Sequence, residues 1–259
     1  GSEMCIRDSI GTGQITKAVV IGIIGSKLKL NKIYISERNK KISKNLRLKS
    51  KKIKIIKNNQ EIIDKSNWVF LAVTPKVGRK ILHKYTYKSN QIIVSFISTI
   101  KMKQLKKIIK VKAKIIRAIP LPPISLRKGP VPMFPPNTKV KKFFNHLGTA
   151  VEIKKENLWL NFWSTSGIMA PFYELLNCMS NWLIKRGIKK EDAQKYITSL
   201  FVALSQDAVI KSKKDLKYLV KESQTPKGLN EQGLKEMNKK GVYKSVISTL
   251  NNIHKRLNK

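Results

Sequence analysis

The stretch "DSIGTGQITKAVVIGIIG", residues 8–25, decides how the first half of the chain is interpreted. It places Gly11 and Gly13 directly before an apolar, helix-like segment. In a Gly-x-Gly-x-x-Gly/Ala turn the first glycine makes the tight turn, the second lets a pyrophosphate approach the backbone, and the third small residue packs helix on strand. Thr16 is bulkier than that third position requires. The glycines alone leave two interpretations open, a dinucleotide-binding turn or an ordinary turn before a core helix.

Short β-branched runs alternate with amphipathic, lysine-rich segments after this turn. Continuous apolar runs are typical of strands buried on both faces of a parallel sheet. Helix-like segments between them, such as residues 58–66 and 100–111, therefore predict an α/β fold with a Rossmann-type, doubly wound parallel sheet. The proline-rich residues 119–137 are expected to form a rigid, irregular segment around a short strand. The predicted strands are residues 32–35, 53–56, 68–73, 91–96 and 114–119.

The residues before the glycine turn lack the apolar run that the central strand of such a sheet should have. Arg7 and Asp8 stand where that strand would be. We therefore interpret residues 1–9 as a non-native leader and expect the first strand to be missing, or short and distorted. The predicted dinucleotide-binding domain is residues 10–153.

Strand-like runs stop after residue 153, and apolar residues recur at helical spacing. Residues 154–259 are therefore predicted to be an all-α domain, with helices over 191–212, 215–222, 228–239 and 243–256. Large apolar side chains occur on more than one face of these helices. More apolar surface than one chain can bury predicts an obligate homodimer through this helical domain.

The charge balance is strongly basic, with 54 Lys and Arg against 15 Asp and Glu and a formal net charge of +39. Such a field attracts phosphate-bearing partners. The lysines are spread along the whole chain, however, and no nucleic-acid-binding motif accompanies them. We interpret the charge mainly as compositional bias and expect nucleic acid to bind non-specifically if at all.

Cysteine and histidine usage excludes two other classes of site. Cys5 and Cys178 lie far apart, and His83, His146 and His254 are scattered. Neither a disulfide framework nor a metal site is expected, and a reducing cytoplasm fits best. The apolar run in residues 18–25 is far shorter than the roughly 20 residues that span a bilayer, so no membrane segment is expected.

The segment "SERNKK", residues 36–41, follows the second predicted strand, where a bound dinucleotide would place its 2′ ribose position. An acidic residue there favours NAD, whereas a hydroxyl with an arginine favours the 2′-phosphate of NADP. Glu37 thus points to NAD, and Ser36 with Arg38 to NADP. Residues 38–57 hold ten Lys or Arg and no acid. We therefore expect NADP, with NAD as the alternative.

Seven sequence blocks in linear order resemble pyrroline-5-carboxylate reductases. The resemblance implies an N-terminal Rossmann domain, a helical domain through which two chains interlock, and hydride transfer from a nicotinamide cofactor to a C=N bond in proline biosynthesis. The cofactor supplies the chemistry in such reductases, and no paired-carboxylate or Ser/His/Asp constellation is evident. The blocks are "IGTGQITKA" (10–18), "NNQEIIDKSNWVFLAVTPK" (58–76), "IIVSFIS" (92–98), "IIRAIPLPP" (115–123), "FFNHLGTAVEI" (143–153), "STSGIMAPFYE" (164–174) and "TPKGLNEQ" (225–232).

The same resemblance assigns cofactor-binding roles along the first domain. The glycine turn would hold the pyrophosphate, the asparagine of the second block would lie near the adenosine, and the "LAVTPK" segment would line the nicotinamide side. Together with the two 2′-position candidates, the expected cofactor-binding residues are Gly11, Gly13, Gln14, Ile15, Thr16, Ser36, Arg38, Asn59, Ala72, Val73, Thr74, Pro75 and Lys76.

The departures from the family's pattern fall on the substrate side. The family's Ser-Pro-Gly-Gly-Thr-Thr loop, which holds the substrate carboxylate, reads "TPKGLN" here, and its Asn-Thr-Pro reads Leu121, Pro122, Pro123. Ile168 and Met169 replace smaller or polar residues. Such changes alter substrate choice more than cofactor use. The expected substrate-binding residues are Ser166, Gly167, Met169, Thr225, Lys227, Gly228 and Asn230.

Catalytic residues are not identified by these patterns; Tyr173 and Thr225 are the candidates. We expect Tyr173 to be a buried core residue rather than a proton donor. Thr225 can equally be interpreted as a substrate-side residue or as a helix cap. Lys227 is interpreted as a solvated lysine. The predicted function is an NAD(P)H-dependent reductase of a small, cyclic, carboxylate-bearing imine. The alternatives are a catalytically altered cofactor-binding relative and a basic nucleic-acid-associated Rossmann protein.

Overall fold

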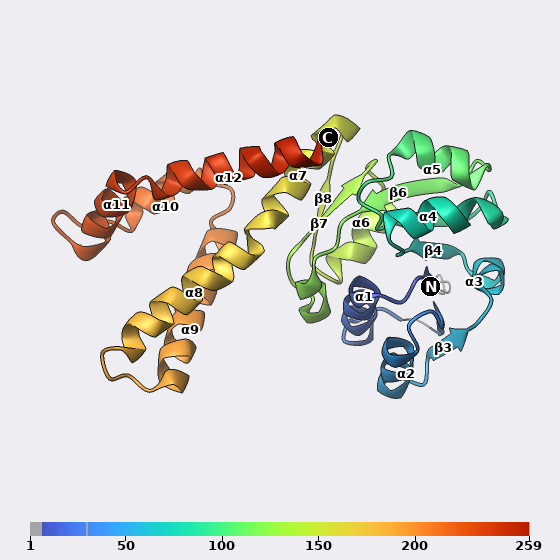
Figure 1. Ribbon diagram of the computed structural model, residues 1–259, viewed down its shortest axis with the longest axis horizontal. Helices are drawn as coiled ribbons and strands as arrows, with labels where there is room; N and C mark the ends of the chain where they lie inside the picture. The colour runs from blue at the N-terminus through green and yellow to red at the C-terminus, as the bar shows by residue number, and fades with distance from the viewer. Residues whose placement is uncertain (1–6, 30, 259) are drawn as a thin grey trace. The chain divides into compact units, whose positions relative to one another are not determined.

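A computed structural model describes residues 7–29 and 31–258 of the chain. The chain divides into two compact units, Gly1–Trp159 and Leu160–Lys259. Figure 1 shows a sheet flanked by helices in the first unit and helices in the second. The architecture is the expected α/β sheet domain followed by a helical domain.

The described part of the first unit forms an eight-stranded sheet in the order β3-β2-β1-β4-β5-β6-β7-β8. All neighbouring strands are parallel except the antiparallel pair β6 and β7. The strand order reverses between β1 and β4, which is where open α/β sheets bind ligands at their carboxyl edge. The strands are β1 Arg7–Ile10, β2 Ile33–Ser36, β3 Ile53–Ile56, β4 Trp68–Leu71, β5 Ile92–Ser95, β6 Lys114–Ala118, β7 Pro130–Phe134 and β8 Thr149–Glu152.

Helices cover both faces of this sheet because successive strand residues point to opposite sides. Trp68 and Phe70 of β4 pack in the core beneath α1, α2 and α6, whereas Val69 and Leu71 pack in the core beneath α3 and α5. The helices of the first unit are α1 Gln14–Ile24, α2 Lys40–Lys49, α3 Asn59–Lys65, α4 Pro75–Ile81, α5 Met102–Ile109 and α6 Thr138–Asn145, with the 3-10 turns η1 Leu82–Lys84, η2 Pro122–Leu126 and η3 Glu156–Leu158.

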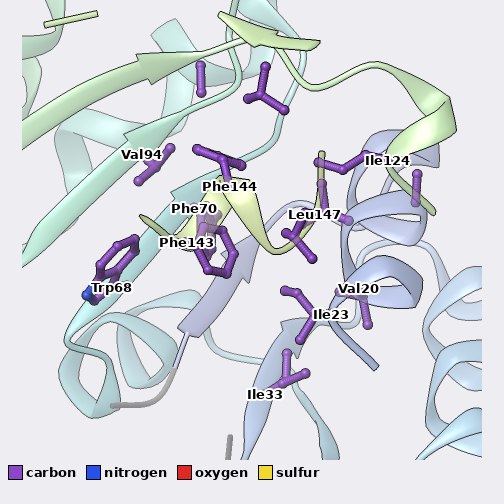
Figure 2. Packing of buried hydrophobic residues seen from close by; sticks show 14 of the residues in the cluster. Val20, Ile23, Ile33, Trp68, Phe70, Val94, Ile124, Phe143, Phe144 and Leu147 are labelled. Carbon is purple, nitrogen blue, oxygen red and sulfur yellow. The ribbon is translucent and has the colours of Figure 1, made fainter. Parts of the chain in front are cut away.

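Aromatic rings fill the core between α6 and the sheet (Figure 2). The Phe143 ring centroid lies 5.5 Å from that of Trp68 and 5.6 Å from that of Phe70. Phe144 and Val94 extend the same cluster. Burying such large rings anchors α6, and with it the chain leading to β8, to the middle of the sheet.

The expectation of a missing first strand is wrong. Residues Arg7–Ile10 form β1, which pairs in parallel with β4 from Arg7 opposite Trp68 to Ile10 opposite Leu71. It also pairs with β2. Strand pairing uses backbone groups, which Arg and Asp carry like any other residue, so the apolar-run criterion missed it. Residues 1–6 of the predicted leader lie outside the described residues.

The proline-rich segment confirms the prediction of an irregular piece around a short strand. It contains η2 and β7, and Arg127 between them adopts a left-handed backbone with φ 58°. η2 packs against α1, with the Ile124 side chain 1% exposed in the core shared with that helix. The proline-rich segment thus packs against the first helix through η2 and adds strand β7 to the sheet.

The second unit is helical throughout its described residues. α8 and α9 form a packed helical hairpin, and α11 packs on α12 (Figure 1). Gly187 lies in the loop after α8 with φ +89°. No helix among the described residues is long and apolar enough to cross a membrane. The elements from the unit boundary onward are α7 Trp159–Thr165, η4 Ser166–Ile168, α8 Met169–Ile184, α9 Lys190–Ile210, α10 Leu216–Glu222, α11 Leu229–Lys239 and α12 Val242–Leu257.

Large apolar side chains of this unit are exposed, as the sequence predicts. Leu204 is 58% exposed and Ile210 is 71% exposed on α9, and Trp182 is 55% exposed on α8. Isolated exposed apolar residues are ordinary, but an extended set on several packed helices marks an interaction surface. Further members are Leu175, Ile188, Tyr196, Val202, Val209, Leu216, Val220 and Ile247.

Candidate functional site

The glycine turn crosses the end of β4 at very close range. Gly11 has φ +101°, and a Cβ built on it would lie 2.4 Å from the carbonyl oxygen of Ala72. The Ala72 N–H donates to the carbonyl of Ile10 over 2.9 Å and so holds the two strand ends together. Gly11 is therefore a structural requirement of the turn.

Substitution of Gly11 by alanine is expected to destabilise the fold. The left-handed backbone and the contact with the Ala72 carbonyl together predict a loss of about 2–4 kcal/mol in the free energy of unfolding. Urea unfolding of the two proteins measures the difference. An unchanged unfolding midpoint would show that the turn relaxes without cost.

Gly13 is required for a different reason. It is the N-cap of α1, and among the described residues, its own chain neighbours aside, no atom lies within 4 Å of its side-chain position and no side chain caps the helix. The first-turn N–H groups of a helix and its dipole attract phosphate. An added Cβ at Gly13 would fill this open cradle, so the turn fits a dinucleotide pyrophosphate, with Gln14 exposed and Ile15 half-buried beside it.

Hydroxyl groups beneath the turn explain why Thr16 is tolerated at the third motif position. The Thr16 hydroxyl donates to the Gly11 carbonyl over 2.8 Å, and the Ser9 hydroxyl donates to the same oxygen over 3.0 Å. Thr16 is 1% exposed and Ser9 is 5% exposed. The larger residue thus replaces close packing by hydrogen bonds that hold the turn.

Ser36, at the end of β2, also belongs to the turn. Its hydroxyl accepts from the Gly11 N–H over 3.0 Å and lies 3.0 Å from the Thr12 hydroxyl, which also donates to the Ser36 carbonyl. Ser36 is 2% exposed, whereas the following Arg38 is exposed and makes no ion pair with the described residues. Arg38 is thus the accessible charged group at this strand end, beside the half-buried Glu37.

The end of β4 carries the other group of cofactor candidates. Ala72 is half-buried and Val73 buried, and Pro75 begins α4 with Thr74 as its N-cap. Thr74 and Lys76 are exposed. Since β4 lies beside β1, this segment and the glycine turn share one edge of the sheet.

Asn59 begins α3 and is half-buried. Its amide nitrogen donates to the Tyr85 hydroxyl over 2.9 Å. Its carbonyl oxygen Oδ1 is buried and has no hydrogen-bond partner among the residues that the structure describes. The structure thus leaves one acceptor of this predicted adenosine-side residue unused.

Three substrate-side candidates lie in the 3-10 turn η4 and at the start of the long helix α8 that follows it. The Ser166 hydroxyl donates to the carbonyl of Trp163 over 2.6 Å and is thereby occupied within its own turn. A Cβ on Gly167 would lie 2.6 Å from Cδ1 of Ile253 on α12. Met169 is the first residue of α8 and is half-buried.

The "TPKGLN" loop forms a tight turn before α11. The Gly228 N–H donates to the Thr225 carbonyl over 2.8 Å, and Lys227 adopts a left-handed backbone with φ 62°. A proline followed by a positive φ normally selects glycine at the second position, where this chain has lysine. The N-cap of α11 is Gly228, so Thr225 does not cap this helix. Asn230 donates its amide to the carbonyl of Ser223 over 2.9 Å.

The expectation that Tyr173 is a buried core residue is wrong for the single chain. Tyr173 is 60% exposed on α8, and its ring lies 5.7 Å from that of Phe172. Helical spacing identified an apolar face but did not show which faces a neighbouring helix of the same chain covers.

The sequence patterns overlooked Ser9 and Arg117. Ser9 lay in the segment interpreted as a leader, whereas Arg117 interrupts a predicted buried strand. A charged residue within an otherwise apolar strand is a usable signal, because fully buried charges are rare unless paired. In the structure Arg117 is 2% exposed and pairs with Glu156 at 2.5 Å.

Two family models match the chain in the order of the two units. The model for NADP oxidoreductase, coenzyme F420-dependent, matches residues 9–99. The model for pyrroline-5-carboxylate reductase dimerisation matches residues 162–259. The second match covers the helical unit that exposes its apolar side chains.

Two curated relatives match nearly the whole length of the chain. Pyrroline-5-carboxylate reductase 2 of Bacillus subtilis (strain 168) is 22% identical over 258 residues, covering 95% of this chain and 92% of the relative. The pyrroline-5-carboxylate reductase of Synechocystis sp. is 23% identical, with 95% of each chain covered. The crystal structure of Plasmodium falciparum pyrroline carboxylate reductase with NADP bound is 19% identical, covers 99% of this chain and 98% of that chain, and superposes with a TM-score of 0.83. With both domain matches in order and relatives along nearly the whole length, the chain is similar to pyrroline-5-carboxylate reductases over both of its units.

Proposed function

We propose that the protein is an NADPH-preferring reductase that transfers hydride to the C=N bond of a small, cyclic, carboxylate-bearing imine. The observation that carries this proposal is the open cradle at Gly13, at the N-terminus of α1 and at the point where the strand order reverses. The relatives named pyrroline-5-carboxylate reductase support the reaction class.

The residues of this chain would bind and orient the reactants. The backbone of residues 11–16 would hold the pyrophosphate, and Ala72–Lys76 would support the nicotinamide side, where the bound cofactor supplies the hydride. The turn at Lys227 would face the substrate carboxylate with the Lys227 ammonium group, since the N–H groups of Lys227 and Gly228 already donate to Glu231 and to the Thr225 carbonyl. Orientation and charge complementarity then lower the barrier without a protein nucleophile.

A fluorescence titration with NADPH and NADH tests the cofactor part of this proposal. Saturable binding of NADPH, tighter than that of NADH, is expected. Absence of saturable binding of either dinucleotide would overturn it. The reaction is tested separately, by NADPH consumption with cyclic imines of varied ring size and carboxylate position.

A catalytically altered relative that binds the cofactor is the second candidate. It is favoured by one observation, that lysine occupies a left-handed position in the predicted substrate loop. Turnover of any imine in the same screen rules this candidate out. Binding of NADPH without turnover of any of them would favour it over the reductase.

Replacement of Arg38 by glutamine is expected to reduce the preference for NADPH over NADH. Arg38 is exposed and makes no ion pair with the described residues, so its guanidinium is available to a 2′-phosphate. Losing a charge-assisted hydrogen bond to the 2′-phosphate is expected to weaken NADPH binding about tenfold and to change NADH binding little. Lys107→Gln on α5 is the matched control, because it removes one charge from the same basic chain. Equal losses of NADPH affinity in the two variants would show that the preference for NADPH comes from the net charge of the protein.

A further inference from the structure

One charged cluster in the first unit, built around a buried arginine, has no part in the proposed cofactor contacts. Arg117 of β6 is 2% exposed, and its guanidinium donates to Oε1 of Glu156 over 2.5 Å and to the carbonyl of Ser98 over 2.6 Å. Its Cζ lies 4.2 Å from the ring centroid of Trp159. The guanidinium therefore joins β6, the loop after β5 and the first residue of α7.

The Ser98 carbonyl is held by two donors. Besides Arg117, the indole N–H of Trp159 donates to it over 3.3 Å. Ser98 lies in the loop between β5 and α5, on the carboxyl edge of the sheet. β5 is the next strand after β4, and the Phe96 N–H donates to the Leu71 carbonyl over 2.9 Å. The fixed loop is therefore the neighbour of the segment expected to line the nicotinamide.

Glu156 fixes the far end of the same loop. Its Oε1 accepts from the backbone N–H of Met102, the first residue of α5, over 2.7 Å, as well as from Arg117. The carboxylate thus holds the start of α5, while the guanidinium holds the loop that leads to it. Removing the guanidinium would release the loop and leave the carboxylate without its cation.

Stability alone does not explain a charged pair at this position. Replacing a buried ion pair by apolar groups of similar volume is often neutral or stabilising. Burial lowers the pKa of Arg117, with the neighbouring Glu156 acting against that shift. The Nε of Arg117 is buried with no hydrogen-bond partner among the described residues, a further cost. The planar guanidinium of Arg117 does, however, place two N–H donors so that each bonds a separate segment of the chain.

We propose that Arg117 is a positioning residue for hydride transfer, which holds the Ser98 carbonyl and with it the β5–α5 loop in place beside the nicotinamide segment. This inference rests on the proposed reductase function. Arg117 acts through the loop and contacts neither substrate nor cofactor. Loss of the Arg117 guanidinium is expected to impair the orientation of bound NADPH more than the affinity for NADPH.

The test compares four full-length proteins: the wild type, Arg117→Met, the double variant Arg117→Met/Glu156→Gln, and the control Arg79→Met, which removes an exposed arginine of α4. The double variant removes both charges of the pair, so no uncompensated charge is left, and it is expected to keep the Tm of the wild type even where the single variant unfolds more easily. Backbone hydrogen exchange of residues 96–102 reports loop order without any reaction. NADPH titration, kcat and the primary isotope effect with deuterated NADPH report orientation.

The double variant is expected to show exchange about tenfold faster in residues 96–102, an NADPH Kd within about twofold of wild type, a kcat lower by about tenfold to a hundredfold, and a larger isotope effect on kcat. A stable double variant with wild-type loop exchange and wild-type kcat would overturn the proposal. A wild-type protein that binds NADPH but reduces none of the imines would contradict the proposed function. In that case unchanged loop exchange in the double variant still overturns the positioning role.

Discussion

Replacing Leu204 by lysine is expected to convert the protein to monomers and to abolish most imine reduction, while NADPH binding stays within about twofold of wild type. Leu204 is 58% exposed on α9, in the unit that matches the dimerisation model. Burying an ammonium group in an apolar interface costs several kcal/mol, enough to dissociate a dimer at micromolar concentration. Activity is expected to fall as well, because we expect the "TPKGLN" loop of one chain to complete the site of its partner.

Sedimentation at micromolar concentration, NADPH titration and turnover measure these three effects on the same samples. The matched control is Gln194→Lys, which adds the same charge to an exposed polar position of α9. Wild-type protein that sediments as a monomer and still turns over substrate would contradict the dimer requirement. Equal losses in both variants would assign the effect to charge on the helix rather than to the apolar surface.

Alanine at Gly13 is expected to abolish most cofactor binding with little effect on folding. Apart from its neighbours along the turn and helix, no atom of the described residues lies within 4 Å of a Cβ built on Gly13, so an added methyl group meets no other part of the described chain and would occupy the space of the pyrophosphate. Losing backbone hydrogen bonds to a charged phosphate costs about 2 kcal/mol, which weakens NADPH binding roughly 30-fold. Alanine is a poorer N-cap than glycine by about 1 kcal/mol, so the Tm should fall by only a few degrees.

Gly233→Ala is the control for this experiment, because Gly233 on α11 also has no atom within 4 Å of an added Cβ. It should leave the Kd for NADPH unchanged. A Gly13→Ala protein that binds NADPH with wild-type affinity would show that the turn does not hold the pyrophosphate. The contrast with Gly11→Ala is informative, since the same change two residues earlier should lower stability through the Ala72 carbonyl.

Elements that depend on local patterns could be predicted from the sequence. The run at residues 53–56 coincides with β3, and the predicted helix at 191–212 differs from α9, Lys190–Ile210, by only one or two residues at each end. β-branched runs are buried wherever helices cover both faces of a sheet, and helical spacing sets burial within a few turns. Both signals are contained in neighbouring residues. β1 was missed because its pairing depends on backbone groups rather than on apolar side chains.

The candidate site contains contacts that local sequence patterns cannot predict. The sequence by itself determined the glycine turn, the order of the sheet and helical domains, and the apolar excess of the helical domain. Only the tertiary structure decided that the Ser36 hydroxyl holds Gly11 and that Arg117 meets Glu156. These partners are separated by 25 and 39 residues along the chain. A hydroxyl or a guanidinium bonds whichever acceptor the packing brings within about 3 Å, and that proximity is fixed by strand order and helix packing rather than by neighbouring residues.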